Sequence, residues 1–194
     1  MLQNLLIVAS SILTIFANIP YLIDTVRKRT KPRIVTWFTW AVLMSIAAVT
    51  SFIEGQYATV VILLTSAIGA TAIVVLGWKN GDKKLEKLDK ICLIGVVVGV
   101  LLWQIFNSPT IGTIAMVLID LLGGIPTTIH AWKKPEEETA ISFALFFLGA
   151  TCTLVAINAW VVTACAYPLF IALNSLMTTI VIISRKRLKT RTIQ

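Results

Sequence analysis

Seven stretches of the chain are almost entirely apolar, and the charged residues gather in the segments between them. A helix needs about 20 apolar residues to cross the hydrocarbon core of a bilayer. The pattern therefore predicts an all-α integral membrane protein in which each stretch is one transmembrane helix. The seven predicted spans are residues 2–24, 35–53, 57–78, 90–107, 109–132, 141–159 and 162–184.

Composition points the same way, because 57% of the residues are hydrophobic and only 13% are charged. About a quarter of the residues in an ordinary globular protein are charged. With a mean hydropathy of +0.88, the chain is too apolar for a soluble domain of this length. We expect a single transmembrane domain over residues 1–184.

The net charge of +8 comes from basic residues on alternate connections between the spans. Every Lys and Arg falls within 27–33, 79–90, 133–134 or 185–191. The N-terminus and the remaining connections carry one charge, Glu54. Because basic residues stay on the cytoplasmic side, the N-terminus is predicted outside and the C-terminus inside. Residues 185–194 then form a basic cytoplasmic tail that contacts anionic lipid. A nucleic-acid partner is not expected, since it would need a basic face on one folded domain.

Cys92, Cys152 and Cys165 all fall within predicted spans, and none belongs to a CxxC pair. This placement predicts buried thiols and neither a disulfide framework nor a metal site or cofactor. Residues 1–20 lack the basic segment and cleavage site of a secretory signal, so we expect the first span to remain in the mature protein. The short connections are typical of a prokaryotic cytoplasmic membrane protein.

A repeat becomes visible when the sequence is compared with itself at a shift of 106 residues. Ile19-Pro20 then matches Ile125-Pro126. The two copies are 1–78 and 108–184, each with three spans, and the linker 79–107 supplies a fourth span. Because each copy has an odd number of spans, two copies joined directly would face opposite ways across the membrane. The fourth span gives the second copy the same orientation as the first. We therefore predict a 3+1+3 arrangement of parallel repeats, related by an axis along the membrane normal.

Four segments carry a resemblance to a known family. They are 18–30 (NIPYLIDTVRKRT), 124–134 (GIPTTIHAWKK), 146–149 (FFLG) and 169–174 (LFIALN). Together with the 3+1+3 layout, they resemble the SWEET, SemiSWEET and PQ-loop (MtN3-like) transporter superfamily. The resemblance implies a pocket between two three-helix bundles near mid-membrane, and alternating access by rocking of one bundle against the other.

This chain also departs from the family's pattern. The Pro-Gln pair of the family is Pro20-Tyr21 in the first copy and Pro126-Thr127 in the second. The pocket asparagine occurs once, as Asn174, and Ile68 stands at the matching position of the first copy. A sugar substrate therefore does not follow from the resemblance.

Residues 109–134 form an apolar stretch that carries Asp120 near its middle, followed by Gly123, Gly124 and Pro126. A carboxylate inside hydrocarbon costs several kcal/mol unless it faces a polar interior, so Asp120 is a candidate functional residue. Burial favours the neutral carboxyl, which would let Asp120 take up a proton and couple it to transport. The alternative is that Asp120 bonds to another helix and only holds the bundle together.

In the pocket that the resemblance implies, the candidate substrate-binding residues are Asp120, Asn174, Asn18, Trp40 and Thr178. A binding site of this kind needs a few placed polar groups on apolar walls. The amide of Asn174 can both donate and accept hydrogen bonds. An interhelical bond, worth roughly 0.5–2 kcal/mol, is the alternative role for Asn174.

Trp37 and Trp40 share one helical face at the start of the second predicted span. We expect Trp37 to belong to an interfacial aromatic belt, with a cation–π contact to Arg33. The alternative, which stays open for Trp40, is a stacking wall or inner gate mirrored by Phe143 and Phe146.

Pro20 and Pro126 occupy matching positions of the two copies. A proline removes a helical hydrogen bond and introduces a kink. Together with Gly123 and Gly124, they are candidate hinges for rocking of the bundles. A static bend needed for packing is the alternative.

One residue and two polar segments near the inner surface are expected to be solvated. The residue is His130, and the segments are the Lys-rich segment 79–90 and the acidic run Glu136 to Glu138. For the acidic run, the alternative is an inner latch that pairs with the first basic loop or with the tail, although exposed ion pairs contribute little.

The sequence contains no HExxH, GxSxG or Walker motif and no His/Cys cluster, so an enzyme is not expected. The predicted function is a uniporter or proton-coupled carrier for a small polar solute, working by alternating access. The alternative is a receptor or scaffold of the same fold that does not transport. A homo-oligomer is compatible with either prediction.

Overall fold

The computed structural model describes residues 2–53, 57–85, 87–106, 109–157 and 160–193. Within these residues the chain forms seven α-helices, one short 3-10 helix and no β-strand, so the all-α prediction is confirmed. The helices are α1 (Leu2–Val26), α2 (Ile34–Ile53), α3 (Tyr57–Gly77), α4 (Lys87–Phe106), α5 (Pro109–Lys133), η1 (Pro135–Glu137), α6 (Ala140–Ala156) and α7 (Val162–Ile193). Each predicted span corresponds to one α-helix.

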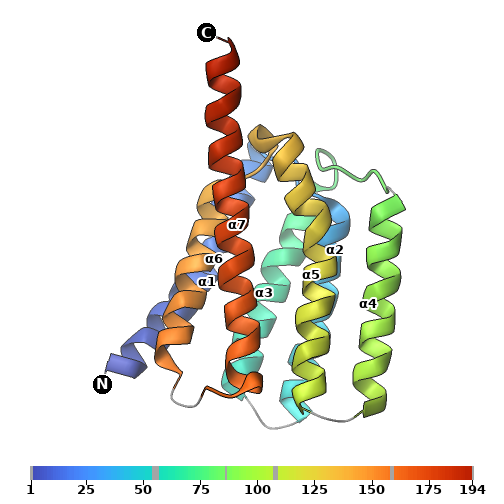
Figure 1. The fold of residues 1–194 in the computed structure, drawn as a ribbon, viewed down its shortest axis with the longest axis vertical. Coiled ribbons are helices and arrows are strands. Elements are labelled where there is room, and N and C mark those ends of the chain that lie inside the picture. The colour runs from blue at the N-terminus through green and yellow to red at the C-terminus, as the bar shows by residue number, and fades with distance from the viewer. Residues whose placement is uncertain (1, 54–56, 86, 107–108, 158–159, 194) are drawn as a thin grey trace.

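The largest difference from the predicted bounds is at the C-terminus. α7 does not end near residue 184 but continues to Ile193 through most of the predicted tail. Arg, Lys and Leu, which dominate that segment, are good helix formers. In Figure 1 the end of α7 consequently projects beyond the other helices.

The helices pack as two groups of three that meet along two seams. α3 contacts both α1 and α2, and α7 contacts both α5 and α6. Between the groups, α1 packs extensively on α6, whereas α2 meets α5 more briefly. α4 packs on α5 at the edge of the bundle (Figure 1). Exchanging α1, α2 and α3 for α5, α6 and α7 maps each of these ring contacts onto another.

Three connections that carry Lys or Arg residues lie together at one end of the bundle, which we call the basic end. They are 27–33, 78–85 and 134–139, drawn at the top of Figure 1. The N-terminus lies at the opposite end. The connections predicted for that opposite end fall largely outside the described residues.

Small and polar residues allow the close approach of α1 and α6. Ser10 Oγ and Thr153 Oγ1 lie 2.6 Å apart in a hydrogen bond, and Gln3 Nε2 donates to the Ala156 carbonyl over 2.8 Å. A Cβ placed on Gly149 would lie 2.9 Å from Thr14 Oγ1 and 3.3 Å from the Ser10 carbonyl oxygen. Gly149 therefore sets the separation of the two groups along this seam.

Replacing Gly149 with Leu is expected to destabilise the protein by about 1–3 kcal/mol, because the new side chain overpacks a seam that has backbone on its far side. Equilibrium unfolding in mixed micelles measures this loss. Leu148→Ala, on the 47% exposed neighbouring position, should change stability much less. Equal effects of the two substitutions would contradict the close packing assigned to Gly149.

By length and composition, two helices of the described chain are able to cross a membrane: Leu2–Val26 and Ala164–Lys189. Shorter apolar segments occur at Ile34–Ser45, Leu63–Gly77 and Ala140–Ala156. Two such helices support a membrane location only weakly, because other apolar helices pass the same test. The seven-span topology stays a prediction.

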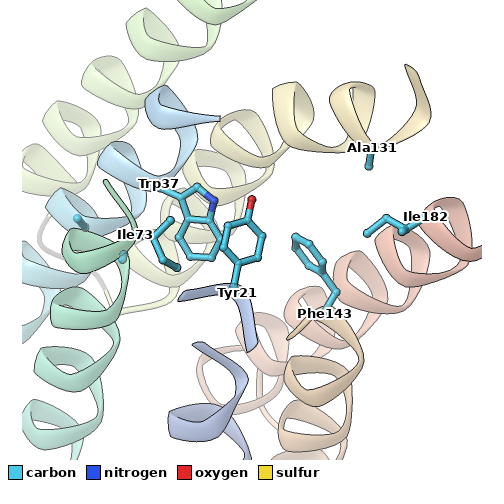
Figure 2. Packing of buried hydrophobic residues seen from close by; sticks show 8 residues of the cluster. Tyr21, Trp37, Ile73, Ala131, Phe143 and Ile182 are labelled. Atoms are coloured by element: carbon cyan, nitrogen blue, oxygen red, sulfur yellow. The ribbon is translucent and has the colours of Figure 1, made fainter. Parts of the chain in front are cut away.

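A hydrophobic core closes the ring near the basic end. It contains Tyr21, Trp37, Ala41, Ala70, Ile73, Ala131, Phe143 and Ile182, so every helix of the ring contributes to it. Figure 2 shows the Tyr21 ring between Trp37 and Phe143. The Tyr21 and Trp37 ring centroids are 4.6 Å apart, and Phe143 stands edge-on to Tyr21 at 6.3 Å. This arrangement is typical of favourable aromatic packing.

Candidate functional site

Asp120 is buried midway along α5, with only 4% of its surface exposed. The Tyr167 hydroxyl, from α7, donates a hydrogen bond to Asp120 Oδ2 over 2.9 Å. In the described part of the chain, Asp120 Oδ1 has no hydrogen-bond partner. A buried acceptor without a partner loses its hydration without compensation. The carboxylate is therefore only half satisfied.

Trp40, from α2, brings the other three-helix group to this carboxylate. Its indole N–H is close to Asp120. Nevertheless, Trp40 Nε1 and Asp120 Oδ1 both lack a hydrogen-bond partner among the described residues. We therefore treat the two groups as neighbours that do not bond directly. A group that both accepts and donates, such as a hydroxyl or a water, has the chemistry to join them.

Gly123 and Gly124 form the surface of α5 beside Asp120. A Cβ on Gly123 would lie 3.8 Å from Trp40 Nε1. A Cβ on Gly124 would lie 3.8 Å from Trp40 Cζ2 and 3.7 Å from Asn174 Nδ2. The two glycines thus place Trp40 and Asn174 directly against the α5 backbone. Five of the sequence candidates therefore lie around one region: Asp120, Gly123, Gly124, Trp40 and Asn174.

Thr178 and Asn18 have other surroundings. The Thr178 hydroxyl is buried and donates to the Asn174 carbonyl over 2.9 Å, one turn earlier in α7. Asn18 lies between α1 and α3, where a Cβ on Gly69 would be 2.8 Å from its Cγ. Its amide donates to the Thr14 carbonyl over 3.4 Å. The described contacts therefore assign Asn18 a packing position within the first group, apart from Asp120.

Pro20 and Pro126 lie inside α1 and α5, and both helices continue through them. Pro126 is buried and Pro20 is partly buried. Neither position shows a break, and hinge motion at them stays a prediction.

The prediction of a membrane-belt position for Trp37 is wrong. Trp37 is 2% exposed, because it packs between Tyr21 and Trp40 in the core. Its indole is 87° to that of Trp40, with the ring centroids 5.0 Å apart. The stacking-wall alternative describes its position better. Tyr21, the central ring of this cluster, was not selected in the sequence, although its place directly after Pro20 was a usable signal.

Three other tryptophans, each near one end of a described helix, are exposed. Trp78, Trp132 and Trp160 have exposed fractions of 55%, 54% and 68%. Cations lie over two of these rings: Lys83 Nζ is 4.9 Å from the Trp78 centroid, and Arg185 is 4.6 Å from that of Trp132. The side chain of Trp103 lies outside the described residues.

Arg33 does not form the predicted cation–π contact but an ion-pair cluster. Its Nη1 is 2.8 Å from Asp82 Oδ2, and its Nη2 is 2.6 Å from each oxygen of Asp89. Arg33 is 5% exposed and Asp89 is 1% exposed. The cluster ties the start of α2 to the start of α4.

The lysines of segment 79–90 are exposed, as predicted, but the prediction is wrong for Asp82 and Asp89, which are partly and fully buried. Burial tends to raise the pKa of Asp82, but the Lys84 N–H and the Arg33 guanidinium outweigh it and hold this pKa below its ordinary value of 3.8. The clue in the sequence was two aspartates within a Lys-rich segment.

His130 is also buried rather than solvated, with 6% of its surface exposed. Its Nδ1 lies 3.6 Å from Asp82 Oδ2, and its Nε2 lies 3.2 Å from Glu137 Oε2. The imidazole thus stands between the Arg33 cluster and the acidic run. Asp82, one of these two neighbours, belongs to a distant part of the sequence.

The acidic run Glu136 to Glu138 pairs with the first basic loop, as in the latch that the sequence analysis gave as the alternative to a solvated run. Lys31 Nζ is 2.6 Å from Glu137 Oε1, and the Lys31 N–H donates to the Glu137 carbonyl over 2.9 Å. Thr30 and Thr139 share a hydroxyl hydrogen bond of 2.6 Å. We call segments 27–33 and 134–139, with the contacts between them, the latch. The latch joins the two three-helix groups at the basic end.

Comparisons with protein families, with curated proteins and with solved structures gave no match to this chain. A function is therefore proposed from the sequence pattern and the geometry of the residues.

Proposed function

We propose that the protein is a membrane transporter of the SWEET and PQ-loop type that carries a small polar solute between its two three-helix groups. The observation that carries this proposal is Asp120. Its carboxylate is buried where α2 of the first group meets α5 and α7 of the second, and Oδ1 has no partner among the described residues. A half-satisfied carboxylate on an otherwise apolar helix is costly, which favours a binding role over a purely structural one.

The ring of helices supports two parallel repeats with a linker. In each group the third helix lies between the first and the second. Between the groups, the first helix of one packs on the second helix of the other, at both seams. α4 lies outside this ring and packs on α5, as a linker helix would. A site on the α2–α5 seam thus lies between the units that alternating access moves.

The apolar exterior supports a location in the cytoplasmic membrane. Only 17% and 22% of the most apolar windows of α1 and α7 are buried, whereas a core helix of a soluble protein is mostly buried. Large apolar side chains are also exposed on other helices, such as Ile68 at 68%, Ile105 at 73% and Val155 at 65%. A continuous apolar exterior is unfavourable in water and favourable in lipid. We therefore propose seven crossings, with the basic end in the cytoplasm.

Alternating access would require the basic end to open. In this conformation the aromatic core and the latch close it. We propose that opening separates the latch while the groups rock about Pro20 and Pro126, where a helical hydrogen bond is missing. Asp120 would then bind solute, a proton or both in turn.

A thermal-shift screen followed by a flux assay tests this function. Detergent-purified protein is heated with sugars, amino acids, nucleosides and vitamins at about pH 5.5 and pH 7.5. A ligand that binds only the folded state raises the melting temperature. Each hit is then offered as a labelled solute to liposomes containing the protein. Transport predicts a hit that also crosses; tight binding without flux would instead identify a receptor, and neither binding nor flux a scaffold.

A further inference from the structure

Glu138 is a buried carboxyl group in the latch, in the connection between α5 and α6 and outside the proposed spans. Only 1% of its surface is exposed. The Tyr21 hydroxyl donates to Glu138 Oε2 over 2.9 Å, across a sequence separation of 117 residues. Oε1 has no hydrogen-bond partner in the part of the chain that is described. The bond joins α1 of the first group to the segment before α6 of the second.

The charged groups around Glu138 are largely engaged with other partners. The titratable and charged groups that act on its carboxyl are Tyr21 from α1, Arg33 from the first loop, Glu137 from η1 and Lys186 from α7. Asp24, Lys31 and His130 contact its chain neighbours Thr139 and Glu137. Lys31 pairs with Glu137, and Arg33 pairs with Asp82 and Asp89. The Lys186 ammonium donates to the Glu138 main-chain oxygen over 3.0 Å.

These surroundings favour a neutral Glu138 while the basic end is closed. Burial removes hydration from the charged form and is the largest effect. The Tyr21 hydrogen bond and the charge of Lys186 favour the ionised form but do not outweigh it. The pKa of Glu138 is consequently raised from 4.5 to about 8.

We propose that Glu138 is a proton-binding site of the latch, which holds a proton while the basic end is closed and releases it to the adjacent water when that end opens. Opening hydrates the carboxylate, separates it from Tyr21 and parts the two halves of the latch. The proton passes to water or buffer on the same side. This inference goes beyond the proposed transport function and does not require that any solute crosses.

The direction of the pH dependence follows from the change in proton binding. The closed form binds one more proton than the open form between the ordinary pKa of 4.5 and the raised pKa of about 8. Within that window each pH unit should shift the equilibrium toward the open form about tenfold. Below about pH 4.5 the equilibrium favours the closed form most strongly and no longer depends on pH. Above about pH 8 the equilibrium again becomes independent of pH.

Cysteine labelling of the full-length protein in detergent tests the site. Ala131 is fully buried in the core at the basic end, so the thiol of Ala131→Cys reports opening. Leu85→Cys, at a position that is 47% exposed, reports the intrinsic reactivity of a thiol at each pH. Peptide-resolved mass spectrometry locates the label without removing the native cysteines. The measured quantity is the ratio of the two labelling rates between about pH 5.5 and pH 9.

We expect the ratio to rise about tenfold per pH unit up to neutral pH and to become flat and low in Glu138→Gln, which mimics the protonated side chain. Glu136→Gln is the matched control, since Glu136 is an exposed member of the same acidic run. Tyr21→Phe removes a donor that favours the charged form and should move the plateau to higher pH. If Tyr21 had only a packing role, its replacement by Phe would not change the pH at which the plateau begins.

Three results would overturn the proposal. The first is a pH-independent ratio in the wild-type protein. The second is an unchanged slope in Glu138→Gln, or an equal loss of slope in Glu136→Gln. The third is a slope that disappears in His130→Gln and persists in Glu138→Gln, because histidine also titrates near neutral pH. Should Glu138→Gln fail to fold, the shift in Tyr21→Phe decides: a plateau at the wild-type pH overturns the proposal.

Discussion

Replacing Arg33 with Met is expected to lower the free energy of unfolding by about 3–5 kcal/mol. Met keeps much of the side-chain volume and removes the charge that faces two carboxylates. Asp89, which is 1% exposed, would lose two bonds of 2.6 Å from the guanidinium, and Asp82 would lose one of 2.8 Å. Breaking a buried ion pair is costly because the remaining charge stays buried without compensation. Equilibrium unfolding in mixed micelles gives the free energy.

A matched pair of variants separates this effect from general loss of charge. Lys31→Met breaks the Glu137 pair, but the Lys31 side chain is 51% exposed, so the loss of stability should be far smaller than in Arg33→Met. Adding Asp89→Leu to Arg33→Met should recover part of the stability, because both buried charges are then gone. If Arg33→Met lowered the free energy of unfolding no more than Lys31→Met does, the ion-pair cluster of Arg33, Asp82 and Asp89 would not stabilise the fold as its burial indicates.

A ligand found in the screen is expected to bind Asp120→Asn about 10–100-fold more weakly than the wild-type protein. Hydrogen bonds to charged groups contribute about 1.5–3 kcal/mol, and each 1.4 kcal/mol is a factor of ten in affinity. Asn keeps the shape of the side chain and can still accept from Tyr167, so the fold should tolerate it. Its neutral amide can neither attract a cationic group nor exchange a proton. Flux that depends on pH in the wild-type protein should lose that dependence.

Asp24→Asn is the control for this prediction. Asp24 is a carboxylate on α1 that accepts a hydrogen bond from Thr139 over 3.0 Å at the basic end. The Asp24→Asn substitution should leave ligand affinity nearly unchanged. Tyr167→Phe, which removes the donor to Asp120, should give an intermediate loss. Full binding and full pH dependence in Asp120→Asn would reduce Asp120 to a structural bond between α5 and α7.

The helices and the candidate carboxylate could be recognised in the sequence because both are local features. An apolar stretch of about 20 residues favours a helix wherever it packs, and all seven helices were predicted within a few residues of their ends except for the C-terminal end of α7. Asp120 is conspicuous because it interrupts such a stretch. The helix end at Ile193 was missed because polar residues with high helix propensity were interpreted as a tail.

Burial at the basic end could not be recognised in this way. Arg33 and His130 occur beside turns and charged residues, a pattern that is typical of solvated loops. The carboxylates that meet Arg33 lie 49 and 56 residues away, and Asp82 also meets His130 from a distant part of the chain. Nothing local indicates which carboxylate will meet which cation. Trp37 was assigned to the membrane surface by its place near the end of a span. The opposing rings of Tyr21 and Trp40 bury it instead.

The sequence by itself determined the all-helical class, the number of helices, the shared side of the basic connections and the isolation of Asp120 in an apolar helix. These depend on hydrophobic pattern and charge, which act over one helix at a time. Only the tertiary structure decided that Trp40 and Tyr167 meet Asp120, that Asn18 does not, and that Glu138 is sealed beneath Tyr21. Those pairings arise from the packing of two three-helix groups, and burial of a polar side chain follows from its neighbours in space.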